Sequence, residues 1–106
     1  MVKFVLLLPK KKNLSRNDFM REWKDVCVPM AAKIPGLRRY VINAVAEEPG
    51  GKSPRYDGIA ELWFDDAASG QTALGSDQGK AVVEHMPKFT DMNNFVLSVT
   101  EEQVII

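Results

Sequence analysis

Short apolar runs and one amphipathic segment set out the first half of the chain. Residues 3–8 (KFVLLL) form an apolar run that ends at a proline, and its length and that proline favour a strand. Residues 37–46 alternate loosely between apolar and polar positions and also predict a strand. A loop rich in glycine and proline at 47–55 separates them from a third strand at 56–64. The second and third strands therefore predict a hairpin with a long loop.

Between the first two strands the spacing of apolar residues changes to that of a helix. Ser15 is a good N-cap and Asp18 follows three residues later, close to a capping-box pattern. Apolar residues then recur every three or four positions, and the resulting stripe consists of Phe19, Trp23, Val26, Met30 and Ile34. Cys27 falls at the edge of this stripe. Pro29 predicts a kink, and Pro35–Gly36 predicts the end of the helix.

A second helical region and a last strand complete the pattern. Residues 65–85 predict a helix that three glycines weaken or break, at positions 70, 75 and 79. Residues 93–106 begin as a strand and end in an apolar tail. The order β-α-β-β-α-β is that of the ferredoxin-like split βαβ plan, so we predict an α+β fold. Its four-stranded antiparallel sheet would carry both helices on one face.

The predicted strands are apolar on both faces, although the helices cover only one. Residues expected on the other face include Val5, Leu7, Val41, Val45, Ile59 and Trp63. A second copy of the sheet is the simplest cover for such a face. We therefore expect a homodimer through the sheet faces, with the two sheets forming a dimeric α+β barrel.

The hairpin also predicts a register. If residues 47–55 form a simple loop, the numbers of paired residues sum to about 102 by the two-residue periodicity of strands. Val41 then lies opposite Glu61, and Arg39 lies opposite Trp63. We predict that Arg39 covers the indole of Trp63 and meets Glu61 directly or through water.

Composition narrows the class of protein. The chain has 106 residues, enough for a single domain over 1–106, with 45% hydrophobic and 26% charged residues. Fourteen basic residues balance fourteen acidic ones, so nothing points to nucleic acid or an anionic membrane. The apolar start is too short for a signal peptide, and no stretch has the length of a membrane span. We expect a cytoplasmic protein.

Motifs for nucleotides, metals and activated serines are missing. GSDQGKA has too short a glycine spacing for a phosphate loop, and Ala81 stands where Ser or Thr belongs. One histidine and one cysteine lie far apart, so no metal site is expected. No serine has the surroundings of a nucleophile elbow. We expect no metal and no cofactor.

Three residues remain as candidates for chemistry, each with a structural alternative. Cys27 is either a reactive thiol or a buried inert one. His85 is either a proton carrier or a residue suited to a helix C-terminus. Tyr40 either polarises a ligand oxygen or packs in the core or an interface.

Four motifs give the sequence a family resemblance. They are F-x-x-x-W at 19–23, IPGLRRY at 34–40, YDGIAELWFDD at 56–66 and KFTDM at 88–92. Together they resemble the EthD family of the dimeric α+β barrel superfamily, which is named for its association with ethyl tert-butyl ether degradation. The resemblance covers nearly the whole chain and implies the fold and the homodimer described above.

A related branch, the methylmuconolactone methylisomerases, carries site residues that can be compared one by one. Its histidine eight residues before the PGL turn corresponds to Cys27, and its tyrosine after the turn corresponds to Tyr40. Its histidine near the end of the second helix roughly matches His85. Its strand cysteine falls at Leu62. One position therefore matches, one matches loosely and two are replaced.

The resemblance implies two alternative functions. One is a cofactor-free enzyme of isomerase, cyclase or monooxygenase type that acts on a small hydrophobic carbonyl or lactone compound in catabolism. Cys27 and His85 would handle protons, Tyr40 would polarise an oxygen, and the substrate would lie against Trp23, Leu62 and Phe89. The other is a non-catalytic binding or accessory protein that uses the same cleft.

Overall fold

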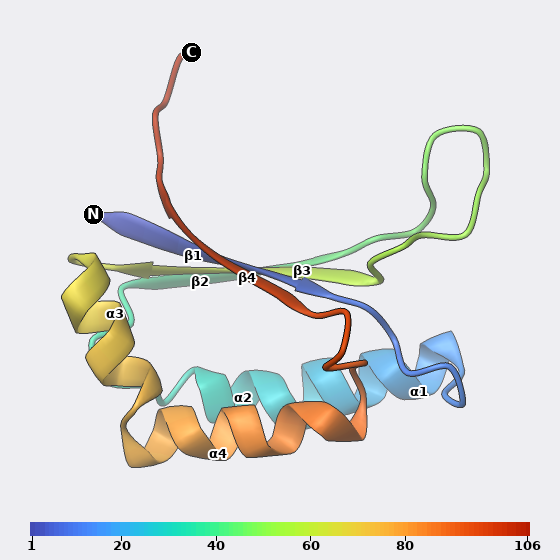
Figure 1. Ribbon diagram of the computed structural model, residues 1–106, viewed down its shortest axis with the longest axis horizontal. Helices are drawn as coiled ribbons and strands as arrows, with labels where there is room; N and C mark the ends of the chain where they lie inside the picture. The colour runs from blue at the N-terminus through green and yellow to red at the C-terminus, as the bar shows by residue number, and fades with distance from the viewer.

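The computed structural model describes residues 1–106 and shows one antiparallel sheet with helices on one side (Figure 1). Its four strands are β1 (Val2–Leu8), β2 (Arg39–Ala44), β3 (Gly58–Phe64) and β4 (Val96–Glu101). They lie in the order β2-β3-β1-β4, with β1 paired to both β3 and β4. This confirms the α+β, ferredoxin-like arrangement predicted from the sequence.

The helices form two parallel rows beneath the sheet (Figure 1). The first row comprises α1 (Arg16–Met20), the π-helical segment η1 (Arg21–Cys27) and α2 (Val28–Ala31), which run as one continuous rod. The second comprises α4 (Asp77–His85) and the 3₁₀ turn η2 (Met86–Lys88), and α3 (Ala67–Leu74) stands at one end of the sheet and leads into it (Figure 1). Because α2 and α4 lie side by side under the strands, the core sits between these rows and the sheet.

Side-chain caps fix where the helices begin. The Ser15 hydroxyl accepts a hydrogen bond from the Asp18 N–H at 3.1 Å, as the capping pattern predicts. Asp66 caps α3 in the same way, and Ser76 caps α4. The second helical region is thus two helices that meet at Gly75, as its glycines predict.

The long first helix differs from a plain α-helix in its middle segment, η1. The seven residues before Val28 are π-helical, and the Val28 N–H bonds to the Trp23 carbonyl, five residues back. A π turn holds more residues than an α turn, so residues four apart, such as Trp23 and Cys27, stay on the same buried face of the helix. Cys27 is consequently buried at 4% exposure, whereas Val26, predicted within the stripe, is 40% exposed. That position of the stripe was predicted wrongly.

The β2–β3 hairpin has the predicted register. Val41 pairs with Glu61 and Arg39 pairs with Trp63. The Arg39 guanidinium lies 4.7 Å from the centre of the Trp63 ring, as predicted. The direct partners of Glu61 are Lys3 at 2.9 Å and Asn43 at 3.0 Å, and these hydrogen bonds lower the pKa of its carboxyl. Arg39 acts on Glu61 only through its charge, so the predicted direct contact is not formed.

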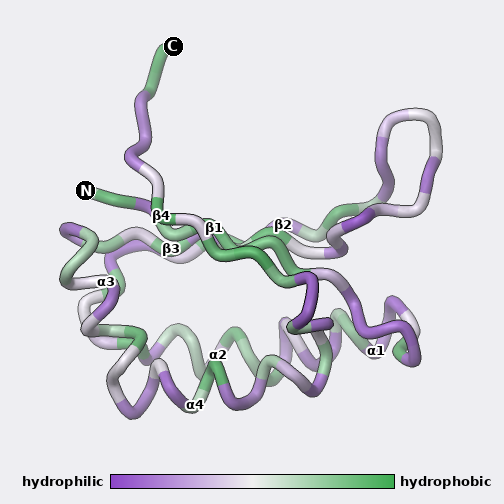
Figure 2. Tube along the Cα trace, viewed as in Figure 1, coloured by the Kyte–Doolittle hydropathy of each residue, from purple (hydrophilic) through white to green (hydrophobic).

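The face of the sheet opposite the helices is open and partly apolar. It bears half-buried Val5, Leu7, Val41 and Ile59. Figure 2 shows a long hydrophobic stretch along β1, in contrast to the largely hydrophilic hairpin loop. Both that loop and the C-terminal residues 102–106 rise on the open side, at opposite ends of the sheet (Figure 1).

Gly58 provides a test of the core packing. An added Cβ at Gly58 would lie 2.5 Å from the Trp23 ring, which is rigid and fully enclosed. We expect Gly58→Ala to destabilise the protein by about 1–3 kcal/mol through overpacking. Gly75→Ala is a matched control, because φ is −84° there and the nearest atoms lie 3.6 Å away. Urea unfolding should show the control unchanged or slightly more stable, and equal stability losses would contradict this packing.

Candidate functional site

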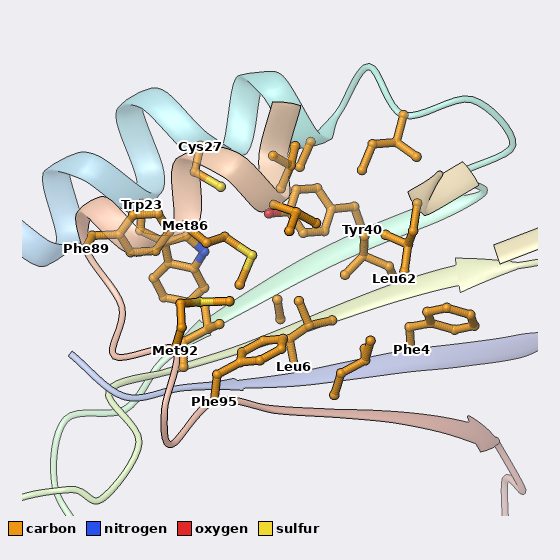
Figure 3. Close-up of a pocket in the computed structure, with 18 residues that line it drawn as sticks. Phe4, Leu6, Trp23, Cys27, Tyr40, Leu62, Met86, Phe89, Met92 and Phe95 are labelled. Carbon is orange, nitrogen blue, oxygen red and sulfur yellow. The ribbon is translucent and has the colours of Figure 1, made fainter. Parts of the chain in front are cut away.

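A cavity of about 220 Å³ lies between the sheet and the two rows of helices (Figure 3). All of its lining side chains are uncharged and mainly apolar. They are Phe4, Leu6, Leu8, Trp23, Cys27, Ala31, Ile34, Tyr40, Ala60, Leu62, Leu74, Val82, Val83, Met86, Phe89, Met92, Phe95 and Leu97. The cavity therefore disfavours charged or strongly polar ligands and suits a small hydrophobic one.

Strand alternation and the π-helical segment bring most of the predicted site residues together around the cavity. Tyr40 and Leu62 are paired across β2 and β3 and point from the sheet toward the helices, as the register predicts. Trp23 and Cys27 come from η1 on the opposite wall. Phe89 follows η2 and closes one end. Of the six site residues predicted from the sequence, these five line the cavity.

Cys27 is held as a protonated thiol. It is 4% exposed and unpaired, and burial away from water raises its pKa from 9.0 to about 11. The thiolate is the nucleophilic and basic form of cysteine. At neutral pH Cys27 is therefore a weak hydrogen-bond donor.

Tyr40 faces the same space with a free hydroxyl. Burial raises the pKa of its phenol, and the nearby Cys27 raises it further. The hydroxyl forms no hydrogen bond with the protein; Figure 3 shows its oxygen directed between the helices and the sheet. Tyr40 can thus donate a hydrogen bond to a ligand oxygen in the cavity.

His85 does not join these two residues. It does not line the cavity, and its ring packs against Phe89 with centroids 5.7 Å apart. Its Nε2 atom lies 3.3 Å from the Glu22 carboxylate, between α4 and η1. The expected meeting of thiol, phenol and imidazole therefore extends only to Cys27 and Tyr40.

The mouth of the cavity was not foreseen from the sequence. Among the lining residues, Val83 is 46% exposed, Met92 36% and Leu97 43%. These residues place the opening between α4 and the edge strand β4. Periodicity along β4 could have indicated Leu97, but the loop residue Met92 belongs to no periodic element.

The structure also bears on metal ligands, membrane spans and Arg38. No group of three or more His, Cys, Asp or Glu side chains is arranged to hold a metal ion. None of the helices has the length and apolar character needed to cross a membrane. Arg38, which precedes Tyr40 by two residues, forms an exposed pair with Asp65 at 2.9 Å.

The fold and the enclosed apolar site define a ferredoxin-like α+β domain built around a small-molecule-sized cavity. Comparison with known families is consistent with this class, since the EthD domain model matches residues 11–93. That match spans well over half of the chain. The chain therefore belongs to the EthD family, as the motifs suggested.

Individual relatives span almost the whole chain. A "4-carboxymethyl-4-methylbutenolide mutase" of Pseudomonas reinekei is 33% identical over 98% of this chain and 100% of its own. An EthD family protein from Bacillus halodurans has a crystal structure with a TM-score of 0.86, at 28% identity over 97% of this chain and 99% of its own. The crystal structure of a dimeric ferredoxin-like protein of unknown function from Bacteroides fragilis has a TM-score of 0.72, at 14% identity over 95% of each chain.

Proposed function

We propose that the protein binds a small hydrophobic carbonyl or lactone compound in the cavity and acts on it with its own side chains. The observation that carries the proposal is the placement of two hydrogen-bond donors, Tyr40 and Cys27, in a cavity that is otherwise apolar. The similarity to a butenolide mutase over nearly the full length of both chains supports a lactone as substrate.

Tyr40 would polarise the carbonyl oxygen of the substrate. In a lactone isomerisation a proton would leave the carbon next to the carbonyl for a water molecule, because no basic side chain lines the cavity, and negative charge would build up on the carbonyl oxygen in the transition state. A phenol donor in a dry cavity stabilises this charge more strongly than water does, because the local dielectric is low. The Cys27 thiol would add a second, weaker donor.

A non-catalytic binding role is the second candidate. The raised pKa of Cys27 and the position of His85 outside the cavity favour it, since no basic group lines the space. A binding or accessory protein needs only the shape and the donors. Native mass spectrometry of protein purified from its own host would identify a retained ligand in either case.

Turnover of lactones tests the enzymatic proposal. Incubation with a panel of small butenolides, followed by proton NMR, should show isomerised or opened product with the wild type. Tyr40→Phe should lower kcat by roughly 10²–10³, the usual loss on removing one donor to a developing oxyanion. His85→Gln should change kcat less than about threefold. Lack of turnover with intact binding would favour the accessory role.

We also propose a homodimer through the open face of the sheet. Half-buried Val5, Leu7, Val41 and Ile59 lie there beside the charged pair Lys3–Glu61. The Bacteroides fragilis neighbour with this fold is described as dimeric. A two-fold arrangement would bury the same apolar residues on both copies.

A further inference from the structure

We infer that the cavity selects uncharged ligands that carry a hydrogen-bond acceptor oxygen and rejects carboxylates. This rests on the proposed function in one respect, that the cavity is the ligand site, and it adds the charge and polarity of the ligand. Three features of the lining support it: the absence of cations, the presence of donors without protein acceptors, and the size of the space.

A carboxylate would find no positive partner in the cavity. None of its 18 lining residues is charged. The two arginines that precede Tyr40 are engaged elsewhere, Arg38 with Asp65 at the surface and Arg39 over Trp63 on the open face. A buried and unpaired charge is strongly unfavourable. A carboxymethyl group, as in the name of the Pseudomonas mutase, would have no cation to meet here.

The polar groups of the lining can all donate a hydrogen bond. Tyr40 and Cys27 are protonated, and neither hydroxyl nor thiol bonds to the protein. Trp23 carries a third donor: its benzene ring packs on Gly58, while Figure 3 shows the indole nitrogen on the edge turned toward the cavity. An indole N–H can only donate. Donors that face the cavity and have no protein acceptor favour a ligand that brings an acceptor oxygen.

The size of the cavity limits the ligand further. An apolar cavity of roughly 150 Å³ accommodates benzene. The present cavity of about 220 Å³ therefore has room for a single ring and a short substituent. Ketones, esters and lactones of that size combine an apolar body with one acceptor oxygen. They are the ligand class that this lining fits.

Three probes of similar shape separate charge from hydrogen bonding. Acetophenone is neutral with a carbonyl, benzoate is charged, and α-methylstyrene replaces the carbonyl by carbon. At pH 7 we expect acetophenone to bind the full chain at least about 100-fold more tightly than benzoate, by calorimetry or ligand titration in NMR. Between pH 7 and 5 benzoic acid should gain about tenfold in affinity per pH unit, because only its neutral form enters.

The donors are tested in the same spectra. The chain has two tryptophans, and Trp63 lies on the opposite face of the sheet, so its indole N–H signal serves as an internal reference. Acetophenone should move the Trp23 signal to low field, whereas α-methylstyrene should not. Tyr40→Phe should weaken the affinity for acetophenone by roughly 3–10-fold and change the affinity for α-methylstyrene by less than about twofold.

Specific results of these titrations would contradict the selection by charge or by hydrogen bonding. Benzoate binding as tightly as acetophenone at pH 7 would overturn the charge selection. Equal binding of acetophenone and α-methylstyrene, with no effect of Tyr40→Phe, would overturn the role of the donors, and failure of all three probes to bind would overturn both. Selective binding without any lactone turnover would support this inference while removing the enzymatic part of the proposed function.

Discussion

Val41→Asp should convert a dimer into monomers. Val41 lies half-buried on the open face of the sheet, across from Glu61. Two-fold symmetry would place the new carboxylate in the interface twice. At about 3 kcal/mol or more for each uncompensated buried charge, the dissociation constant should rise by roughly 10⁴. Size-exclusion chromatography with light scattering should give about twice the 11.9 kDa chain mass for the wild type and a single chain mass for the variant.

Val26→Asp is the matched control for this experiment. Val26 is 40% exposed on the helical side of the molecule, so its replacement should leave the mass unchanged. Far-UV circular dichroism would show whether the Val41 variant is a folded monomer, and Val41→Ser provides a milder form of the same change. A wild-type protein that is monomeric at micromolar concentration, or a Val41 variant that remains dimeric, would contradict an interface on this face.

The fold could be predicted from the sequence because independent signals agreed. Strand periodicity, the Ser15 cap and the glycines of the second helical region each indicated the same element order that the structure shows. The hairpin register followed from loop length alone and placed Arg39 over Trp63. Side chains alternate between the two faces along a strand, so one register determines both the partner and the face of every residue in the hairpin.

The contacts of long side chains could not be predicted in the same way. Glu61 was expected to meet Arg39 as a diagonal neighbour on the hairpin. Its cationic partner, Lys3, comes from β1, which pairs with β3 on the other side. Both Arg39 and Lys3 lie over the Trp63 ring, and Lys3 is the one that also reaches the Glu61 carboxylate, at 2.9 Å. Such choices depend on three strands at once, and a two-strand register does not contain them.

The site was predicted in part because five of its residues lie on regular elements. Tyr40 and Leu62 follow strand alternation, and Trp23 follows the helix stripe. Cys27 was placed at the stripe edge by α-helical arithmetic, and the π-helical turn moves it fully inside. His85 was a candidate as the only histidine of the chain and matched the related branch loosely, whereas its position on α4 directs it toward Glu22.

Cys27 should react with thiol reagents much more slowly than a free cysteine. Its pKa of about 11 lowers the thiolate fraction at pH 7.5 by roughly 300-fold relative to an ordinary thiol near 8.5, and its burial slows access further. Labelling with iodoacetamide across pH 7–10 should therefore show a rate that keeps rising with pH and no plateau near 8.5. In denaturant the same thiol should label at the ordinary rate.

Moving the thiol by one residue is the sharpest control. The double variant Val26→Cys, Cys27→Ala places a cysteine on the exposed side of η1, where labelling should follow an ordinary pKa. Acetophenone in the cavity should slow labelling of Cys27 and leave the Cys at position 26 unaffected. His85→Gln should change neither rate, because the imidazole does not line the cavity. An apparent pKa of Cys27 below 8.5 that rises in His85→Gln would instead show an activated thiolate, and Cys27 would then be a proton acceptor rather than a donor.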